Sequence, residues 1–66
     1  MTAKNFLHYL NLIGIDIKKV EIIQDFNVLL FFSPKDLRHG NMDTFLERCL
    51  LNSFSVKNNV LMVYIK

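Results

Sequence analysis

The chain has 66 residues, which is enough for one small domain spanning residues 1–66 and for no more. Its hydrophobic content of 52% predicts a dense core, and its formal net charge of +2 is too small to indicate nucleic-acid binding by itself. The single cysteine, Cys49, excludes an internal disulfide and predicts a reducing compartment, for which we expect the cytoplasm.

The composition also bears on membranes and on origin. No run approaches the ~18 apolar residues that a membrane helix needs, and the apolar residues 6–15 are followed by no small-residue cleavage site, so we expect neither membrane insertion nor secretion. The chain has one alanine, no tryptophan and abundant asparagine, lysine, isoleucine and phenylalanine. This bias is typical of an AT-rich coding sequence, such as that of a phage, a mobile element or a low-GC bacterium.

Residues 3–13 are predicted to form an amphipathic helix. Phe6, Tyr9, Leu10 and Ile13 recur at helical spacing, and Leu7 lies beside them. Thr2 is a suitable N-cap. Gly14 can end the helix in the left-handed conformation, with Ile15 placed to contact Leu10 in a Schellman motif.

Two strands are predicted next, over residues 17–24 and 28–32. The first alternates Val20 and Ile22 with Lys19 and Glu21. The second is apolar at every position, and its length and flanking turn signals favour a strand over a helix. Residues 25–27, Asp-Phe-Asn, form the turn of an antiparallel hairpin.

The connection after this hairpin combines signals for a short helical turn and for a second helix. Ser33 can cap the turn, Pro34 suits its first position, and Asp36 follows three residues after the cap. The turn ends at Gly40, and a second helix begins at Asn41 or Asp43. Its apolar stripe consists of Met42, Phe45, Leu46, Cys49 and Leu50.

The last part of the chain is predicted to hold a third strand. The second helix fades over residues 52–55, residues 57–59 form a turn, and residues 60–65 are an apolar strand. The order α-β-β-(short helical turn)-α-β predicts a small α+β domain, with a three-stranded sheet and both helices packed on one face.

Sorting the strand residues by alternation gives two apolar faces. One face takes Val20, Ile22, Val28, Leu30, Phe32, Val60, Met62 and Tyr64. The other takes Ile23, Leu29, Phe31, Leu61, Val63 and Ile65. Because helices on one face leave the other exposed, we expect this second set to form an interface with a second copy or with another protein. The alternative is a three-layer monomer, in which one helix covers each face.

No catalytic constellation, cofactor site or metal site is predicted. The serines lack a glycine elbow, and Cys49 lies on the apolar stripe of the second helix, which favours a packing role. His8, His39 and Cys49 lack the spacing of zinc ligands. Asp36 and Asp43 have helix-capping explanations, so we expect no carboxylate pair and no enzyme.

A nucleic-acid alternative rests on the segment SPKDLRHGNMD, residues 33–43. Lys35, Arg38 and His39 lie between two predicted helix starts, which suits a phosphate. The element order is similar to that of the bacterial (type II) KH domain, which implies an RNA-clamping GxxG loop at this place. Here Gly40 is followed three residues later by Asp43, an acidic residue. The order also resembles a ferredoxin-like fold without its first strand, which leaves a sheet edge open to another chain.

We therefore expect a non-enzymatic protein–protein interaction domain, either a self-associating regulator or a small inhibitor encoded by a phage or mobile element. The alternative is a small nucleic-acid-binding module that uses Lys35, Arg38 and His39, with Lys18, Lys19 and Lys57 as further contacts. Helix capping and turn formation explain residues 33–43 better than phosphate binding or the completion of an open sheet edge does.

Overall fold

The computed structural model is a small α+β fold, and the residues that it describes form two helices and a four-stranded mixed sheet. It describes residues 1–13, 16–35 and 40–66, although nothing is described for the side chains of residues 11–13 and 40–43. The elements are α1 (Ala3–Ile13), β1 (Lys19–Gln24), β2 (Asn27–Phe32), α2 (Gly40–Arg48), β3 (Leu51–Lys57) and β4 (Val60–Ile65). The predicted three-stranded sheet is wrong by one strand, because residues 51–57 are β3 and not the end of a helix.

Helix α1 has the bounds that the apolar spacing predicts. The hydroxyl oxygen of Thr2 accepts a hydrogen bond from the backbone N–H of Asn5 at 3.2 Å, which confirms Thr2 as the N-cap. Phe6, Leu7 and Leu10 are buried, whereas Tyr9 is exposed. The predicted Schellman motif at residues 14–15 lies outside the described residues.

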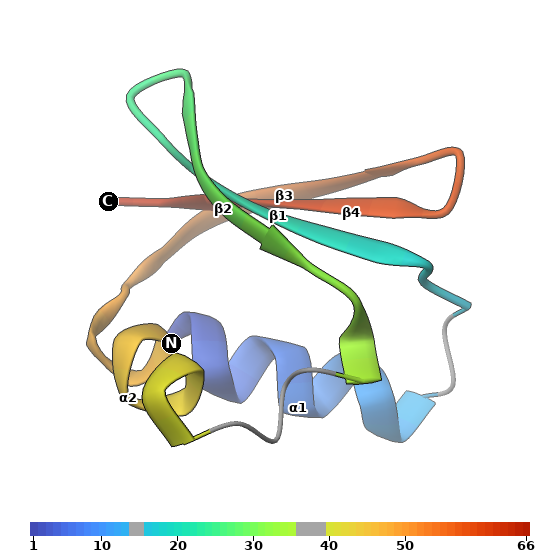
Figure 1. Cartoon of the computed structure of the whole chain (residues 1–66), viewed down its shortest axis with the longest axis horizontal. Coiled ribbons are helices and arrows are strands. Elements are labelled where there is room, and N and C mark those ends of the chain that lie inside the picture. Colours follow the sequence, from blue (N-terminus) through green and yellow to red (C-terminus); the bar gives the residue numbers. More distant parts are fainter. Residues whose placement is uncertain (14–15, 36–39) are drawn as a thin grey trace.

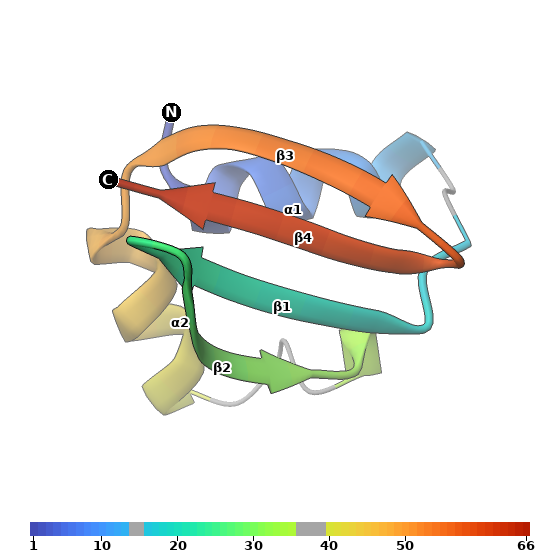
Figure 2. The same ribbon diagram turned by 90° about the horizontal axis from the view of Figure 1, so that it is seen from above.

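The sheet has the order β2-β1-β4-β3 (Figure 2). Its two central strands, β1 and β4, are parallel, with Val20 beside Leu61 and Ile22 beside Val63. Each is joined to an edge strand by an antiparallel hairpin, β1 with β2 and β3 with β4. The chain therefore alternates a helix with a hairpin twice, and the central pair unites the two hairpins.

Both helices lie against the same face of the sheet (Figure 1). The backbone N–H of Ala3 donates to the carbonyl of Cys49 at 2.8 Å, and that of Leu51 donates to the carbonyl of Met1 at 3.0 Å, so the start of α1 is tied to the end of α2. The three-layer alternative is not what the chain forms. Among the described residues, no helix combines the length and the apolar character that crossing a membrane requires.

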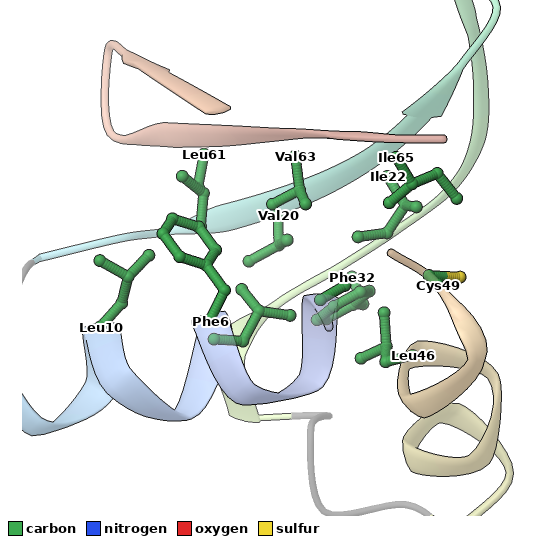
Figure 3. Packing of buried hydrophobic residues seen from close by; sticks show 12 residues of the cluster. Phe6, Leu10, Val20, Ile22, Phe32, Leu46, Cys49, Leu61, Val63 and Ile65 are labelled. Atoms are coloured by element: carbon green, nitrogen blue, oxygen red, sulfur yellow. The ribbon is translucent and has the colours of Figure 1, made fainter. Parts of the chain in front are cut away.

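The core fills the space between this face and the helices (Figure 3). The buried residues of its sheet side come from β1, β2 and β4, β3 adds only the partly buried Leu51, and Leu46 of α2 closes one end of the core. The buried members are Ala3, Phe6, Leu7, Leu10, Val20, Ile22, Phe32, Leu46, Cys49, Leu61, Val63 and Ile65, with Ile17, Leu30, Phe45 and Leu51 packed against them. Leu61, Val63 and Ile65 are thus core residues, and the predicted assignment of the last strand's two faces is wrong.

Both hairpins have two-residue turns in which each residue has a positive φ. The pairs are Asp25–Phe26, with φ of 52° and 67°, and Asn58–Asn59, with φ of 53° and 65°. These values fit the type I′ turn, which matches the twist of the strands and favours Asn or Gly. A phenylalanine in the left-handed region costs roughly 1–2 kcal/mol relative to glycine. The two turns therefore share a geometry, but only the second has the residues that this geometry favours.

The connection between β2 and α2 is described only at its ends. Pro34 and Lys35 enter a short helical turn, as predicted, and α2 begins at Gly40, close to the predicted start. The predicted capping role of Asp36 falls outside the described residues, as do Arg38 and His39.

Candidate functional site

The face of the sheet that turns away from the helices carries no element of the described chain, and we call it the open face (Figure 2). Strand register identifies its members, because residues paired across neighbouring strands share a face. They are Lys19, Glu21, Ile23, Phe31, Ser53, Ser55, Lys57, Val60, Met62 and Tyr64. The centre of this face is apolar, and β3 gives it a polar margin of two serines and a lysine.

A small charged group lies on the open face beside an aromatic ring. The Lys19 Nζ atom is 3.3 Å from a carboxylate oxygen of Glu21 and 4.5 Å from the centroid of the Phe31 ring. Both contacts are partly exposed, so each contributes at most about 1 kcal/mol. Their main consequence is local neutrality, since one positive and one negative charge neighbour each other on this face.

Ile23, Met62 and Tyr64 form the apolar centre of the open face. The Tyr64 hydroxyl donates to the sulfur of Met62 at 3.8 Å, which holds the two side chains together. Ile23 pairs with Val28 on one side and with Tyr64 on the other. It is buried although it is not part of the core cluster, so its shielding comes from neighbours on the open face.

The end of the β1–β2 hairpin, residues 24–29, projects beyond the open face, and we call it the hairpin arm (Figure 1). Phe26 at its tip is 103% exposed, and Val28 and Leu29 are 50% and 46% exposed. Beside the arm, Phe31 is 66% exposed. Taking about 150–250 Å² for a whole aromatic side chain, these four residues expose on the order of 400 Å² of apolar surface.

A register irregularity explains why so many apolar residues of β2 are exposed. Ile22 pairs with Leu30, but Ile23 pairs with Val28, so Leu29 is an extra residue on β2. Such a bulge changes the alternation of the strand. Val28 and Phe31, three residues apart, consequently share the outer side, while Leu30 packs on the core.

The structure divides the six residues of the predicted interface into two groups. Ile23 and Phe31 lie on the open face, and Leu29 lies on the hairpin arm. Leu61, Val63 and Ile65 lie under the helices, and their places on the open face are taken by Val60, Met62 and Tyr64.

Sequence reasoning missed Phe26 and Val28. The signal for Phe26 was present, because an aromatic residue stands inside a turn between Asp and Asn, where small or polar residues are usual. For Val28 there was no such signal, since its face depends on the bulge.

Basic residues gather at the opposite end of the sheet from the hairpin arm. The backbone N–H of Lys18 donates to the carbonyl of Asn59 at 2.8 Å, and Lys19 and Lys57 both pair with Val60. Lys18, Lys35 and Lys57 are exposed. Because Arg38 and His39 lie outside the described residues, the predicted contact set of Lys35, Arg38 and His39 cannot be located as a group.

The one cysteine of the chain is placed for packing. Cys49 is buried, its Sγ donates to the carbonyl of Phe45 at 3.2 Å, and burial raises the pKa of its thiol. A raised pKa reduces the thiolate fraction at neutral pH, which disfavours nucleophilic chemistry. Within the described parts of the chain, no three His, Cys, Asp or Glu residues form a group that could hold a metal ion.

Comparison with known proteins adds no relative to this description. No family model matches the chain, and neither a curated protein nor a solved structure matches it significantly. The similarity to the KH order rested on three strands, and the observed order has four, so that resemblance loses its basis.

Proposed function

We propose that this protein is a non-enzymatic protein–protein interaction domain, a self-associating regulator or a small inhibitor, that binds its partner through the open face and the hairpin arm. The observation that carries the proposal is the run of exposed apolar residues Phe26, Val28, Leu29 and Phe31 next to an apolar sheet centre. The amino-acid composition of the chain suits a phage or mobile-element gene product that acts in the cytoplasm.

The exposed area supports a binding role. A surface patch on the order of 400 Å² is large for a chain whose whole accessible surface is 4711 Å². Covering it corresponds to about 10 kcal/mol of hydrophobic free energy before the costs of association. That figure is comparable with the entire stability of a small domain, so leaving the patch exposed carries a solubility risk that a partner removes.

The arrangement of polar groups supports binding to protein. The Lys19–Glu21 pair and the serines of β3 surround an apolar centre, and this pattern of an apolar middle with a polar rim is that of a protein–protein interface. The face is also built on strands of a packed sheet, so it is preformed and loses little entropy on binding.

Photocrosslinking tests this proposal. A benzophenone amino acid replaces Phe31 in one variant and Val56 in a second, and each is expressed in the source cell and irradiated. Val56 is the matched control, because it is 48% exposed but lies on the helix side of β3, opposite Leu61. We expect a discrete adduct from position 31 and none from position 56.

Phe31→Asp completes the test. Because Phe31 is mostly exposed, this substitution should leave the fold intact, with a stability change of about 1 kcal/mol or less from the lost contact with Lys19. A third crosslinking variant, with the benzophenone amino acid at the half-exposed Val28, should also give an adduct, and Phe31→Asp should abolish that adduct. Equal adducts from positions 31 and 56, or none from either, would refute the interaction role of the open face.

A second candidate function, nucleic-acid binding, is favoured by the lysines at the far end of the sheet. Lys18 immediately precedes β1, Lys19 is the first residue of β1 and Lys57 is the last residue of β3, and backbone pairing with Val60 and Asn59 brings them together. Lys35 adds a fourth positive charge from the segment after β2. Lys19 and Lys57 are also members of the open face, whereas Lys18 and Lys35 are not, so substitutions at Lys18 and Lys35 separate this candidate from the first.

For this candidate we expect binding to a single-stranded oligonucleotide that weakens steeply with salt, by a logarithmic slope of about −0.7 per phosphate neutralised. Fluorescence anisotropy over a salt series measures the slope. Lys18→Gln and Lys57→Gln should each make the slope shallower by the value of about one phosphate contact. Lys4→Gln, at a lysine of α1, should leave the slope unchanged. Binding that ignores salt would rule the candidate out.

A further inference from the structure

We infer that the partner of the open face is a second copy of this chain, and that the hairpin arm of each copy lies across the open face of the other with Phe26 as its anchor. This inference rests on the proposed function and specifies it. It follows from the shape, the charge and the size of the surface, and from the conformation of Phe26.

The conformation of Phe26 indicates that its side chain has a role outside the turn. The two hairpins share one turn geometry, and the β3–β4 hairpin satisfies it with Asn58–Asn59. The β1–β2 hairpin has Phe26 in the left-handed region instead, and there its side chain is fully exposed. A strained residue with no packing contact in its own domain points to a contact with another molecule.

The shape of the surface is complementary to itself. One molecule carries an exposed apolar residue, Phe26, at the tip of the hairpin that projects beyond the open face (Figure 1), and an apolar area around Met62 and Tyr64 on that face. A two-fold axis through the open face places each tip on the other molecule's apolar area, and both contacts form at once. This isologous arrangement closes at two copies.

The charge of the open face also permits a second copy. A surface of one sign would repel its own image across a two-fold axis. Here Lys19 and Glu21 neighbour each other at 3.3 Å, so rotation can place each charge near the opposite charge of the other copy. The remaining described charge on this face, Lys57, lies at the outer strand β3.

The area matches what a dimer requires. Four strands of about six residues cover roughly 400 Å² in projection, at about 4.8 Å between strands and 3.3 Å per residue. The hairpin arm adds on the order of 300 Å² of exposed side chain. The total falls within the ~600–1,000 Å² per partner of a standard-size interface.

The test is the solution mass of the full chain over a dilution series, from about 1 mM to about 1 µM, by sedimentation equilibrium. We expect a dimer with twice the 7.8 kDa chain mass. Phe26→Asn should weaken the dimer about tenfold or more, since it removes the anchor, and it should keep or raise the melting temperature of the monomer. A residue that only supported the fold would lower the melting temperature when it is replaced. Weaker dimerisation with an unchanged or higher melting temperature therefore identifies Phe26 as an anchor of the interface. Phe26→Gly, which also suits the turn, should repeat the result.

A matched pair of valines separates the two faces of the sheet. Val28 and Val56 are 50% and 48% exposed and lie on the two edge strands, on opposite faces. Val28→Lys should weaken the dimer at least tenfold, whereas Val56→Lys should leave it unchanged, with circular dichroism confirming that both variants fold.

Each remaining outcome contradicts the inference. A dimer that ignores Phe26→Asn and Val28→Lys uses another surface, and a larger assembly lacks the two-fold closure. A wild-type monomer at all concentrations excludes the second copy. In that case, a hetero-adduct from the crosslinker at position 31 would leave the interaction function standing, and the absence of any adduct would remove both.

Discussion

Leu61→Ala is expected to lower the free energy of unfolding by about 2–5 kcal/mol, whereas Leu29→Ala should change it by less than about 1 kcal/mol. Both leucines belong to the interface predicted from the sequence, but they have opposite environments. Leu61 is 1% exposed in the centre of the core, and Leu29 is the half-exposed extra residue of β2. The same chemical change therefore removes packed volume at one site and mainly solvated surface at the other.

Urea unfolding followed by circular dichroism measures the two changes. Both variants should be made in the Phe26→Asn background, so that association does not contribute to the stability of either. A loss of about 2–5 kcal/mol is a large part of a small domain's total, so Leu61→Ala should be partly unfolded without urea. A small effect at Leu61 together with a large one at Leu29 would show that β4 turns its other face to the helices.

Local signals in the sequence were sufficient for most of the elements. The bounds of α1 follow from Thr2 as its cap and from apolar spacing, and the first hairpin follows from an alternating run and an apolar run on either side of a short turn. These features depend on residues within a few positions of each other. The sequence alone therefore predicts them well.

The face of β4 could not be predicted in the same way. Residues 60–65 are all apolar, so alternation contains no information about which side is buried. Only the pairing of Val20 with Leu61 and Ile22 with Val63 places the odd-numbered residues under the helices. The paired residues are 41 positions apart in the chain, and no local pattern encodes their pairing.

The exposed apolar residues of the hairpin arm depend on a β-bulge in β2, which strict alternation along a strand does not predict. The extra residue at Leu29 puts Val28 and Phe31 on one side, although their odd spacing assigns them to opposite sides. Sequence analysis therefore found part of the candidate site, Ile23, Leu29 and Phe31. It missed Phe26 and Val28, the other exposed apolar residues of the hairpin arm.

Strand β3 was missed because its ends do not resemble strand boundaries. The apolar stripe of α2 continues through Cys49 and Leu50, and the sequence Asn-Ser-Phe-Ser that follows has little β-branched content. The helix nevertheless ends at Arg48, and the chain pairs with β4 from Leu51 to Lys57. Tertiary pairing thus overrides a weak local preference.

Substitutions at Phe6 and Phe54 test the position of β3, because the two rings are in contact between α1 and this strand. The two rings lie with centroids 4.6 Å apart at 44°, so α1 supports β3 at the outer edge of the sheet. Phe6 is buried, and Phe6→Ala should cost about 3–5 kcal/mol. Phe54 is half-exposed, so Phe54→Ala should cost about half of a full aromatic burial, roughly 1–1.5 kcal/mol.

A double-mutant cycle isolates the contact from these separate losses. Because Phe6→Ala alone can unfold a small domain, the cycle uses Phe6→Leu and Phe54→Leu, which keep most of the apolar volume. We expect a coupling of about 0.5–1.5 kcal/mol between the two positions. The control pairs Phe6→Leu with Phe26→Leu, at the tip of the hairpin arm on the other side of the sheet, and should show no coupling.

A coupling of zero between Phe6 and Phe54 would mean that residues 51–57 do not lie over α1. The polar margin of the open face, which β3 supplies, would then be lost with that strand, and the interface would have to be redrawn from β1, β2 and β4 alone.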